Sequence, residues 1–146
     1  MKPEQRYWRN RVQPVFAAIT GVEYERVELR TGKSGMPDVY YTCGHSGWIE
    51  LKWSVLKPDP IDGIIHNIDL NGWDTPQRRW ARKHCAAGAT VFLLVGTAQG
   101  SFMIDASLAV NLDEVHITSR AVVWFWPGKI NPAEFKRVLK SRADER

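Results

Sequence analysis

The chain has little cysteine and no long apolar run. Cys43 and Cys85 are its two cysteines, and they lack Cys-x-x-Cys spacing. They therefore indicate neither a zinc site nor a disulfide framework, and we expect reduced thiols in the core. No apolar run approaches the roughly 20 residues of a membrane span, and residues 1–6 lack the apolar segment of a signal peptide. These absences predict a cytoplasmic protein with no membrane partner.

Acidic residues are missing from two basic segments. One is the cluster Arg78, Arg79, Arg82 and Lys83, and the other spans residues 136–142. The chain has a net charge of +4 and a pI near 9.2, which points weakly to nucleic acid. Each basic segment alone fits a solvent-exposed helix face as well as it fits a phosphate-binding surface.

The composition is that of a folded globular domain. Of 146 residues, 44% are hydrophobic and 25% are charged, which excludes a disordered chain. This length suits a single domain with a sizeable core. We expect that domain to span 1–146, with a core at about 4–104 and a C-terminal hairpin and helix added over 105–146.

Residue patterns along the chain predict an α/β fold. Apolar residues after Pro3 recur at helical spacing, and Pro14 is expected to kink that helix or divide it. Thr75-Pro76 and Asn131-Pro132 each open a further helix. Residues 54–74 show no clear period and are expected to form a long loop that covers a site or meets a second subunit. Strands are predicted at 23–29, 38–43, 48–53, 90–95, 101–104 and 122–126.

Two carboxylates and a lysine lie on consecutive predicted strands. Pro37-Asp38 opens one strand, and Glu50-Leu51-Lys52 lies inside the next. Because side chains alternate along a strand, Glu50 and Lys52 share a face while Leu51 points to the other. Two carboxylates and an ammonium group together suit a hard divalent cation and an activated water. This pattern indicates phosphodiester-cleaving chemistry.

The hairpin between these strands must be irregular for the motif to assemble. A two-residue turn at His45-Ser46 would pair Asp38 with Trp53, which leaves Asp38 on the wrong face for Glu50 and Lys52. We therefore predict an odd-length turn or a β-bulge that brings Asp38 opposite or diagonal to Lys52.

With these motifs, the chain resembles the PD-(D/E)xK nuclease superfamily. It is most similar to the small phage-encoded members that are described as Holliday-junction-resolvase-like or VRR-NUC-like. The resemblance implies a restriction-endonuclease-like mixed sheet, with a core of helix, three strands, helix and strand, flanked by helices. The matching residues are Glu4, residues 26–28, Gly35-x-Pro37-Asp38, Glu50-Leu51-Lys52, Thr75-Pro76-Gln77 and residues 88–91.

The resemblance also implies a role for each matching residue. Asp38, Glu50 and the Leu51 carbonyl would bind Mg²⁺, which Mn²⁺ can replace, and Lys52 would orient water or stabilise phosphate charge. Glu4 and Gln77 would point toward this site, although each also fits an ordinary helix N-terminus. The residues expected to contact DNA phosphates are Arg30, Lys33, Arg78, Arg79, Arg82 and Lys83.

Three readings of the function remain open at this point. The first is a metal-dependent endonuclease that acts on branched DNA as a homodimer. It would act in the cytoplasm, and in the cytoplasm of a host if the chain is phage-encoded. The second is a nicking or DNA-degrading nuclease without junction preference, and the third is an accessory DNA-binding subunit. His45, His66 and His84 have no partner at ligand spacing and are expected to be non-catalytic. Trp73 is expected to pack rather than to stack on bases.

Overall fold

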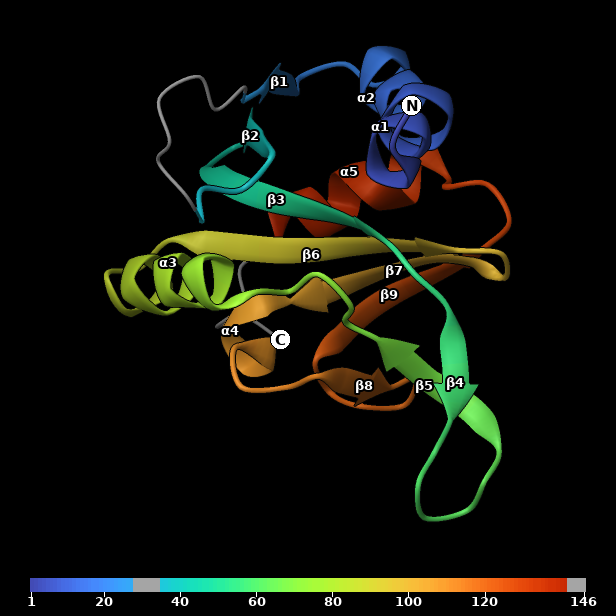
Figure 1. Ribbon diagram of the computed structural model, residues 1–146. Coiled ribbons are helices and arrows are strands. Elements are labelled where there is room, and N and C mark those ends of the chain that lie inside the picture. The colour runs from blue at the N-terminus through green and yellow to red at the C-terminus, as the bar shows by residue number, and fades with distance from the viewer. Residues whose placement is uncertain (28–34, 142–146) are drawn as a thin grey trace.

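Helices lie near both ends of the chain, and nine strands with two further helices lie between them in the described residues (Figure 1). The computed structural model describes residues 1–27 and 35–141. The helical elements are α1 (Pro3–Tyr7), a π-helical turn η1 (Trp8–Val12), α2 (Gln13–Ala18), α3 (Thr75–Ala86), α4 (Ala106–Ala109) and α5 (Pro132–Lys140). The strands are β1 (Glu23–Arg26), β2 (Val39–Thr42), β3 (Ser46–Trp53), β4 (Leu56–Pro58), β5 (Ile65–Asp69), β6 (Thr90–Thr97), β7 (Gly100–Asp105), β8 (Glu114–His116) and β9 (Val122–Pro127).

A six-stranded mixed sheet forms the centre of the fold. Its strand order is β1-β2-β3-β6-β7-β9. The β3–β6 pair is parallel and the other neighbours are antiparallel. A parallel pair needs a crossover, which here runs through β4, β5 and α3. The predicted mixed sheet flanked by helices is therefore confirmed, and β9 extends it beyond the core that the motifs cover.

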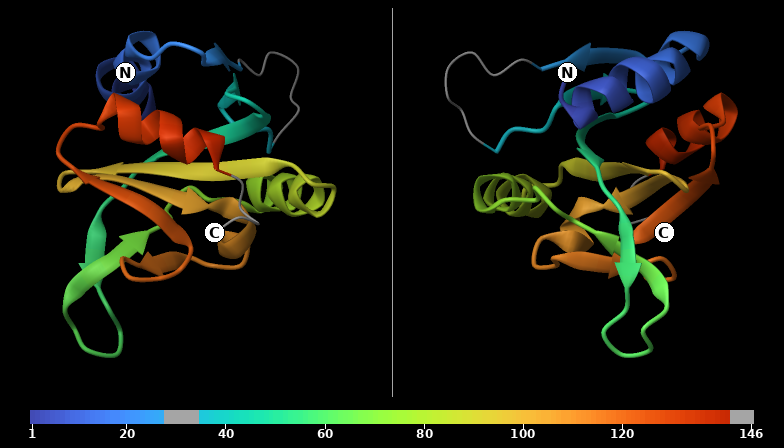
Figure 2. Two further views of the ribbon diagram at one scale, coloured as in Figure 1. Left: turned by 180° about the vertical axis from the view of Figure 1, so that it is seen from behind. Right: turned by 45° about the vertical axis from the view of Figure 1, so that its right-hand side comes forward.

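The two faces of the sheet carry separate hydrophobic cores. On β6, Phe92 and Leu94 join the core beneath the N-terminal helices and α5, whereas Leu93 and Val95 join the core beneath α3 and α4. Figure 2 shows α5 and α3 on opposite sides of β6. The continuous apolar sequence of β6 follows from this arrangement, because a central strand covered on both faces has no solvent side.

The β2–β3 hairpin has an odd-length turn. Val39 pairs with Ile49 and Thr42 with Ser46, so residues 43–45 form a three-residue loop. Gly44 has a φ of +78° in this loop, a left-handed conformation that glycine adopts without steric cost. Continued by one residue, the register sets Asp38 opposite Glu50 and diagonal to Lys52. The predicted irregular hairpin is thus confirmed.

Residues 54–74 form regular structure where a long loop was expected. β4 and β5 make a hairpin, and β8 pairs with β5 to complete a separate three-stranded sheet. The hairpin projects from the body of the protein (Figures 1 and 2). Its strands are short and interrupted by a register shift after Lys57, so no period of two is visible in the sequence.

Two helix starts differ in detail from the predictions. The N-terminal helix is divided as expected, but the break is the π-helical turn η1, and Pro14 lies in the first turn of α2. Asp74 rather than Thr75 caps α3, because its carboxylate accepts the Gln77 amide at 2.9 Å. Asn131 caps α5 as predicted. Within the described residues, no helix is long and apolar enough to cross a membrane.

Substituting Gly96 with alanine should destabilise the fold by about 1–3 kcal/mol, as overpacking does. A Cβ at Gly96 would lie 2.5 Å from Cε1 of Tyr7. The ring has no room to move, since it is 3% exposed and its hydroxyl is 2.7 Å from Ser101 Oγ. Urea denaturation of Gly96→Ala gives the free energy. In a Tyr7→Ala background the same change should cost nothing, and an unchanged cost there would contradict the steric explanation.

Candidate active site

Asp38 and Glu50 lie opposite each other, one directly before β2 and the other in the neighbouring strand β3. Asp38 directly precedes β2, and its Oδ2 accepts the Leu51 amide of β3 at 2.8 Å. The amide and carbonyl of one strand residue point toward the same antiparallel neighbour. The Leu51 carbonyl therefore faces the Asp38 side of β3 as well. Two carboxylates and a backbone carbonyl converge here, as the sequence motif required.

Lys52 is buried beside Glu50 on the face of the sheet that α3 covers. Its Nζ lies 3.0 Å from Glu50 Oε2, 2.7 Å from the Gly72 carbonyl and 2.9 Å from Gln77 Oε1. Lys52 is 3% exposed and Glu50 4%. An ammonium group has three donors, so these three acceptors satisfy all of them. The lysine is therefore held in one orientation with almost no solvent contact.

Gln77 joins the helix cap to the buried charges. Its backbone amide is held by Asp74, and its Oε1 also accepts the Asp74 amide at 3.2 Å. With Oε1 facing Lys52, its Nε2 donates to Glu50 Oε2 at 3.1 Å. The predicted inward orientation of Gln77 is confirmed. Gln77 is also a helix-capping residue, which was the alternative expectation. Its side chain accepts from the Asp74 amide at the helix start and also contacts Lys52 and Glu50.

Burial and a like charge act on Glu50. They raise its pKa to about 8, with desolvation the larger cause and the neighbouring Asp38 the second, while Lys52 opposes both. A divalent cation between Asp38 and Glu50 would remove this repulsion and favour the ionised carboxylate. The donors are hard oxygens, which Mg²⁺ and Mn²⁺ prefer. The residues present therefore fit such an ion.

Glu4 is not in contact with this cluster. It is half-buried in the first turn of α1. In the described part of the chain it makes no hydrogen bond or ion pair with Asp38, Glu50 or Lys52. The helix packs its Tyr7 with Ile49 and Leu51, in the core on the other face of β3. Its proposed role near the metal stays a prediction.

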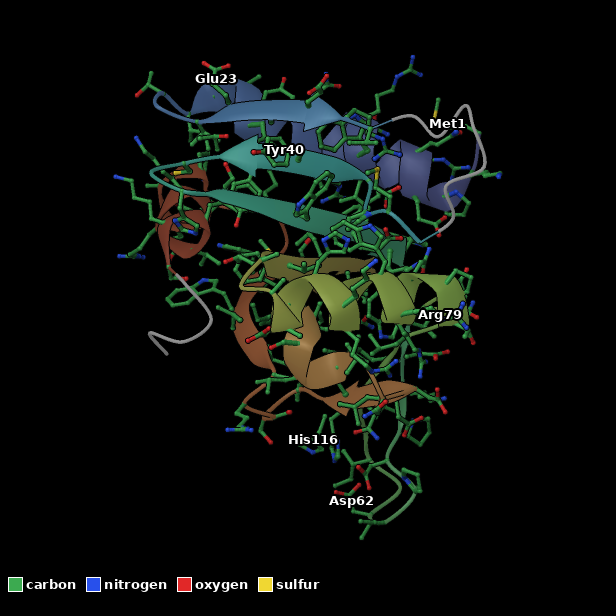
Figure 3. The ribbon with its side chains drawn as sticks, turned by 90° about the vertical axis from the view of Figure 1, so that its left-hand side faces the viewer. Met1, Glu23, Tyr40, Asp62, Arg79 and His116 are labelled. Atoms are coloured by element: carbon green, nitrogen blue, oxygen red, sulfur yellow. The ribbon has the colours of Figure 1, made fainter. Side chains whose placement is uncertain are left out.

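The basic residues of α3 fall into two groups. Arg78 pairs with Asp113 at 2.8 Å, and Arg82 donates to Asn111 Oδ1 at 2.8 Å. Arg79 and Lys83 are exposed, and Figure 3 labels Arg79 at the surface of α3. Arg30 and Lys33, the other predicted DNA contacts, lie outside the described residues.

Two contributors to the site were missed by sequence reasoning. Gly72 supplies the carbonyl that accepts from Lys52, and Asp74 fixes Gln77. A backbone carbonyl gives no residue-type signal, but the Asp-x-x-Gln spacing of a capping box was readable. The neighbouring Trp73 packs as predicted, since it is 4% exposed and its Nε1 donates to the Ala109 carbonyl.

The fold as a whole is similar to a solved nuclease structure. No family model and no curated protein matches the sequence. A structure of Hjc from Archaeoglobus fulgidus, a Holliday junction resolvase from an archaeal hyperthermophile, superposes with a TM-score of 0.55 at 14% identity. The match covers 90% of this chain and 98% of that one. The chain has a resolvase fold. Its restriction-endonuclease-like sheet carries Asp38, Glu50 and Lys52 at the positions described above.

In metal-free buffer, the stability of this resolvase-fold protein should fall as pH rises from about 5 to 8. The folded Glu50 carboxyl has a pKa near 8, so the native state keeps a proton that the unfolded chain loses above its ordinary pKa. The folded state therefore loses up to about 1.4 kcal/mol per pH unit from this group. Urea denaturation in EDTA measures the slope.

Glu50→Gln is the matched control for this titration. It retains a hydrogen-bonding side chain but cannot ionise, so its stability should fall less over the same range. Asp38→Asn should give an intermediate slope, because it removes the second cause of the raised pKa while burial remains. Equal slopes for wild type and Glu50→Gln would mean that Glu50 is already ionised in the metal-free fold.

Proposed function

We propose that the protein is a divalent-metal-dependent DNA endonuclease that hydrolyses phosphodiester bonds in branched DNA. The observation that carries the proposal is the convergence of Asp38, Glu50, Lys52 and Gln77 on one face of the sheet. Two carboxyl groups that share a site disfavour each other's ionisation unless a cation lies between them, so their convergence adds no stability to the metal-free fold. The resolvase fold supports the same function.

Asp38, Glu50 and the Leu51 carbonyl are the proposed ligands of Mg²⁺, with Mn²⁺ as a substitute. So few protein ligands suit Mg²⁺, which keeps several waters and takes substrate phosphate as a further ligand. When bound, the ion would polarise the scissile phosphate and acidify a coordinated water. Asp38 is already oriented for this role, because its Oδ2 accepts a hydrogen bond from the Leu51 amide.

Lys52 is the proposed positioning group for the attacking water or the phosphate. All three of its donors are occupied by Glu50, Gly72 and Gln77. If Glu50 turned to hold a cation, one ammonium donor of Lys52 would be left for the substrate. The other two acceptors keep Nζ in place meanwhile, so little reorganisation is needed as charge develops on the phosphate.

Branched DNA is the proposed substrate because the similar structure is a Holliday junction resolvase. Resolution cuts two opposed strands and so needs two sites, which is why a homodimer is proposed as the active form. A nuclease without junction preference uses the same residues and differs only in substrate. The accessory-subunit reading has less support, because Asp38, Glu50 and Lys52 are all present and lie together with Gln77.

Purified protein should nick plasmid and cut a synthetic four-way junction with Mg²⁺ or Mn²⁺, and should be inactive in EDTA. Asp38→Ala and Lys52→Ala should each lower the single-turnover rate by about 100-fold or more, the scale for loss of a charge-stabilising group. Cleavage is followed on denaturing gels. A faster rate on the junction than on a linear duplex of the same arm sequence supports the resolvase-like activity.

Gln99→Ala, in the β6–β7 turn, serves as a control for handling and folding and should retain activity. Equal rates on junction and duplex would favour the nuclease without junction preference. If wild-type protein binds DNA but cuts neither substrate with either metal, the accessory reading stands and the enzyme proposal fails.

Arg79 and Lys83 should provide more DNA affinity than Arg78 and Arg82. Arg82 is exposed like the first pair, but both it and Arg78 are already bound, to Asn111 and Asp113 respectively. Arg79→Ala/Lys83→Ala should reduce the slope of log K against log salt by about 2, because each phosphate that is no longer neutralised lowers the slope by about one unit. Fluorescence anisotropy at several salt concentrations measures the slope. Arg78→Ala/Arg82→Ala is the matched double variant, and an equal or larger slope change there would contradict this assignment.

A further inference from the structure

Two histidines and an aspartate meet in the small sheet, apart from the candidate active site. Asp59 follows β4, His66 lies in β5 and His116 in β8. One ligand atom from each lies within 4.8 Å of the others, and all three residues are half-buried. Figure 3 shows His116 at the end of the molecule that also carries Asp62, below α3 in that view. None of these residues contributes to the site at Asp38 and Glu50.

An oxygen near Nδ1 of each imidazole would allow metal ligation through Nε2. In metal sites the ring nitrogen that does not bind metal usually donates to an oxygen, which fixes the orientation of the ring. Here Asn67 Oδ1 lies 3.3 Å from His66 Nδ1, and Thr118 Oγ1 lies 2.7 Å from His116 Nδ1. Each histidine therefore has an oxygen at its Nδ1. In addition, the Asp62 carboxylate is 2.8 Å from His66 Nε2.

We propose that Asp59, His66 and His116 bind one transition-metal ion, with zinc the best match, and that Asp62 or water takes the fourth position. Two imidazoles and a carboxylate suit zinc. Ligand atoms around tetrahedral zinc lie about 3.4 Å apart, given bonds of about 2.0–2.1 Å. The ligand atoms lie within 4.8 Å of one another, so binding would require the side chains to move closer together. The ion would fasten the projecting β4–β5 hairpin to β8.

Two contacts compete with the metal and limit its affinity. The Thr118 amide also approaches His116 Nδ1, at 3.0 Å. It favours the tautomer with the proton on Nε2, whereas ligation needs the proton on Nδ1, donated to the Thr118 hydroxyl. The hydrogen bond between His66 and Asp62 must also open or be replaced by shared ligation. Binding therefore exchanges existing hydrogen bonds for metal–ligand bonds.

Titration of the tag-free chain with Zn²⁺ by calorimetry, in excess Mg²⁺ to occupy the candidate active site, tests the proposal. Wild type should bind one equivalent. Nitrogen-15 NMR of the histidine rings should show Nε2 of His66 and His116 shifting with that equivalent, while His45 and His84 stay unchanged. This NMR measurement needs no substitution, so it decides the proposal even where a variant fails to fold.

Substitutions separate this site from the other. His116→Gln and Asp59→Asn should each weaken zinc binding by at least about 10-fold. Removing a hydrogen-bond partner of a metal ligand already costs about 10–100-fold in affinity, and removing the ligand itself should cost no less. His84→Gln, whose ring stacks on Trp80, and Asp38→Asn/Glu50→Gln should both retain it. Zinc binding that survives in His116→Gln but is lost in Asp38→Asn/Glu50→Gln would overturn the proposal, as would ring shifts outside His66 and His116. Neither result depends on whether the protein cleaves DNA.

Discussion

The buried ion pair between Glu50 and Lys52 constrains the rest of the active-site region. Both residues point into the space between β3 and α3, where they are almost fully removed from solvent. Removing two charges from water is costly unless their remaining hydrogen bonds are satisfied. The Gly72 carbonyl and the Gln77 amide satisfy them. The segment before α3 and the start of α3 are therefore held against β3 by polar contacts in addition to apolar packing.

The three-residue turn of the β2–β3 hairpin has a direct chemical consequence. A shift of one residue would turn Asp38 to the opposite face of the sheet, and the Leu51 amide would lose its acceptor. The turn thus determines whether two carboxylates share one site. Burial is the larger cause of the raised pKa of Glu50, and the register adds to it because it brings Asp38 close. The geometry that suits a cation is unfavourable for the metal-free protein.

Much of this arrangement could be predicted because the interactions are local or follow from strand alternation. The shared face of Glu50 and Lys52 needs only the period of a strand, and the odd-length turn followed from requiring Asp38 on that face. The small sheet could not be predicted in the same way. Its strands are short, and its β5–β8 pairing joins residues far apart in the sequence, such as Asn67 and His116. His116 therefore gave no signal at ligand spacing from His66.

Charge counts along the sequence overstate the surface that remains for DNA. Four basic residues within six positions of α3 suggested one phosphate-binding face. At about 100° per residue they spread over an arc of about 140°, with Arg78 and Arg82 toward one edge of it and Arg79 and Lys83 toward the other. Arg78 and Arg82, four apart, are satisfied by Asp113 and Asn111 beside α4. Arg78 and Arg82 thereby connect α3 to the segment that follows α4, and so support the helix that presents Gln77. The same basic segment is thus partly structural. Within the described residues, Arg79 and Lys83 can meet a phosphate without first breaking a hydrogen bond or ion pair, whereas Arg78 and Arg82 cannot.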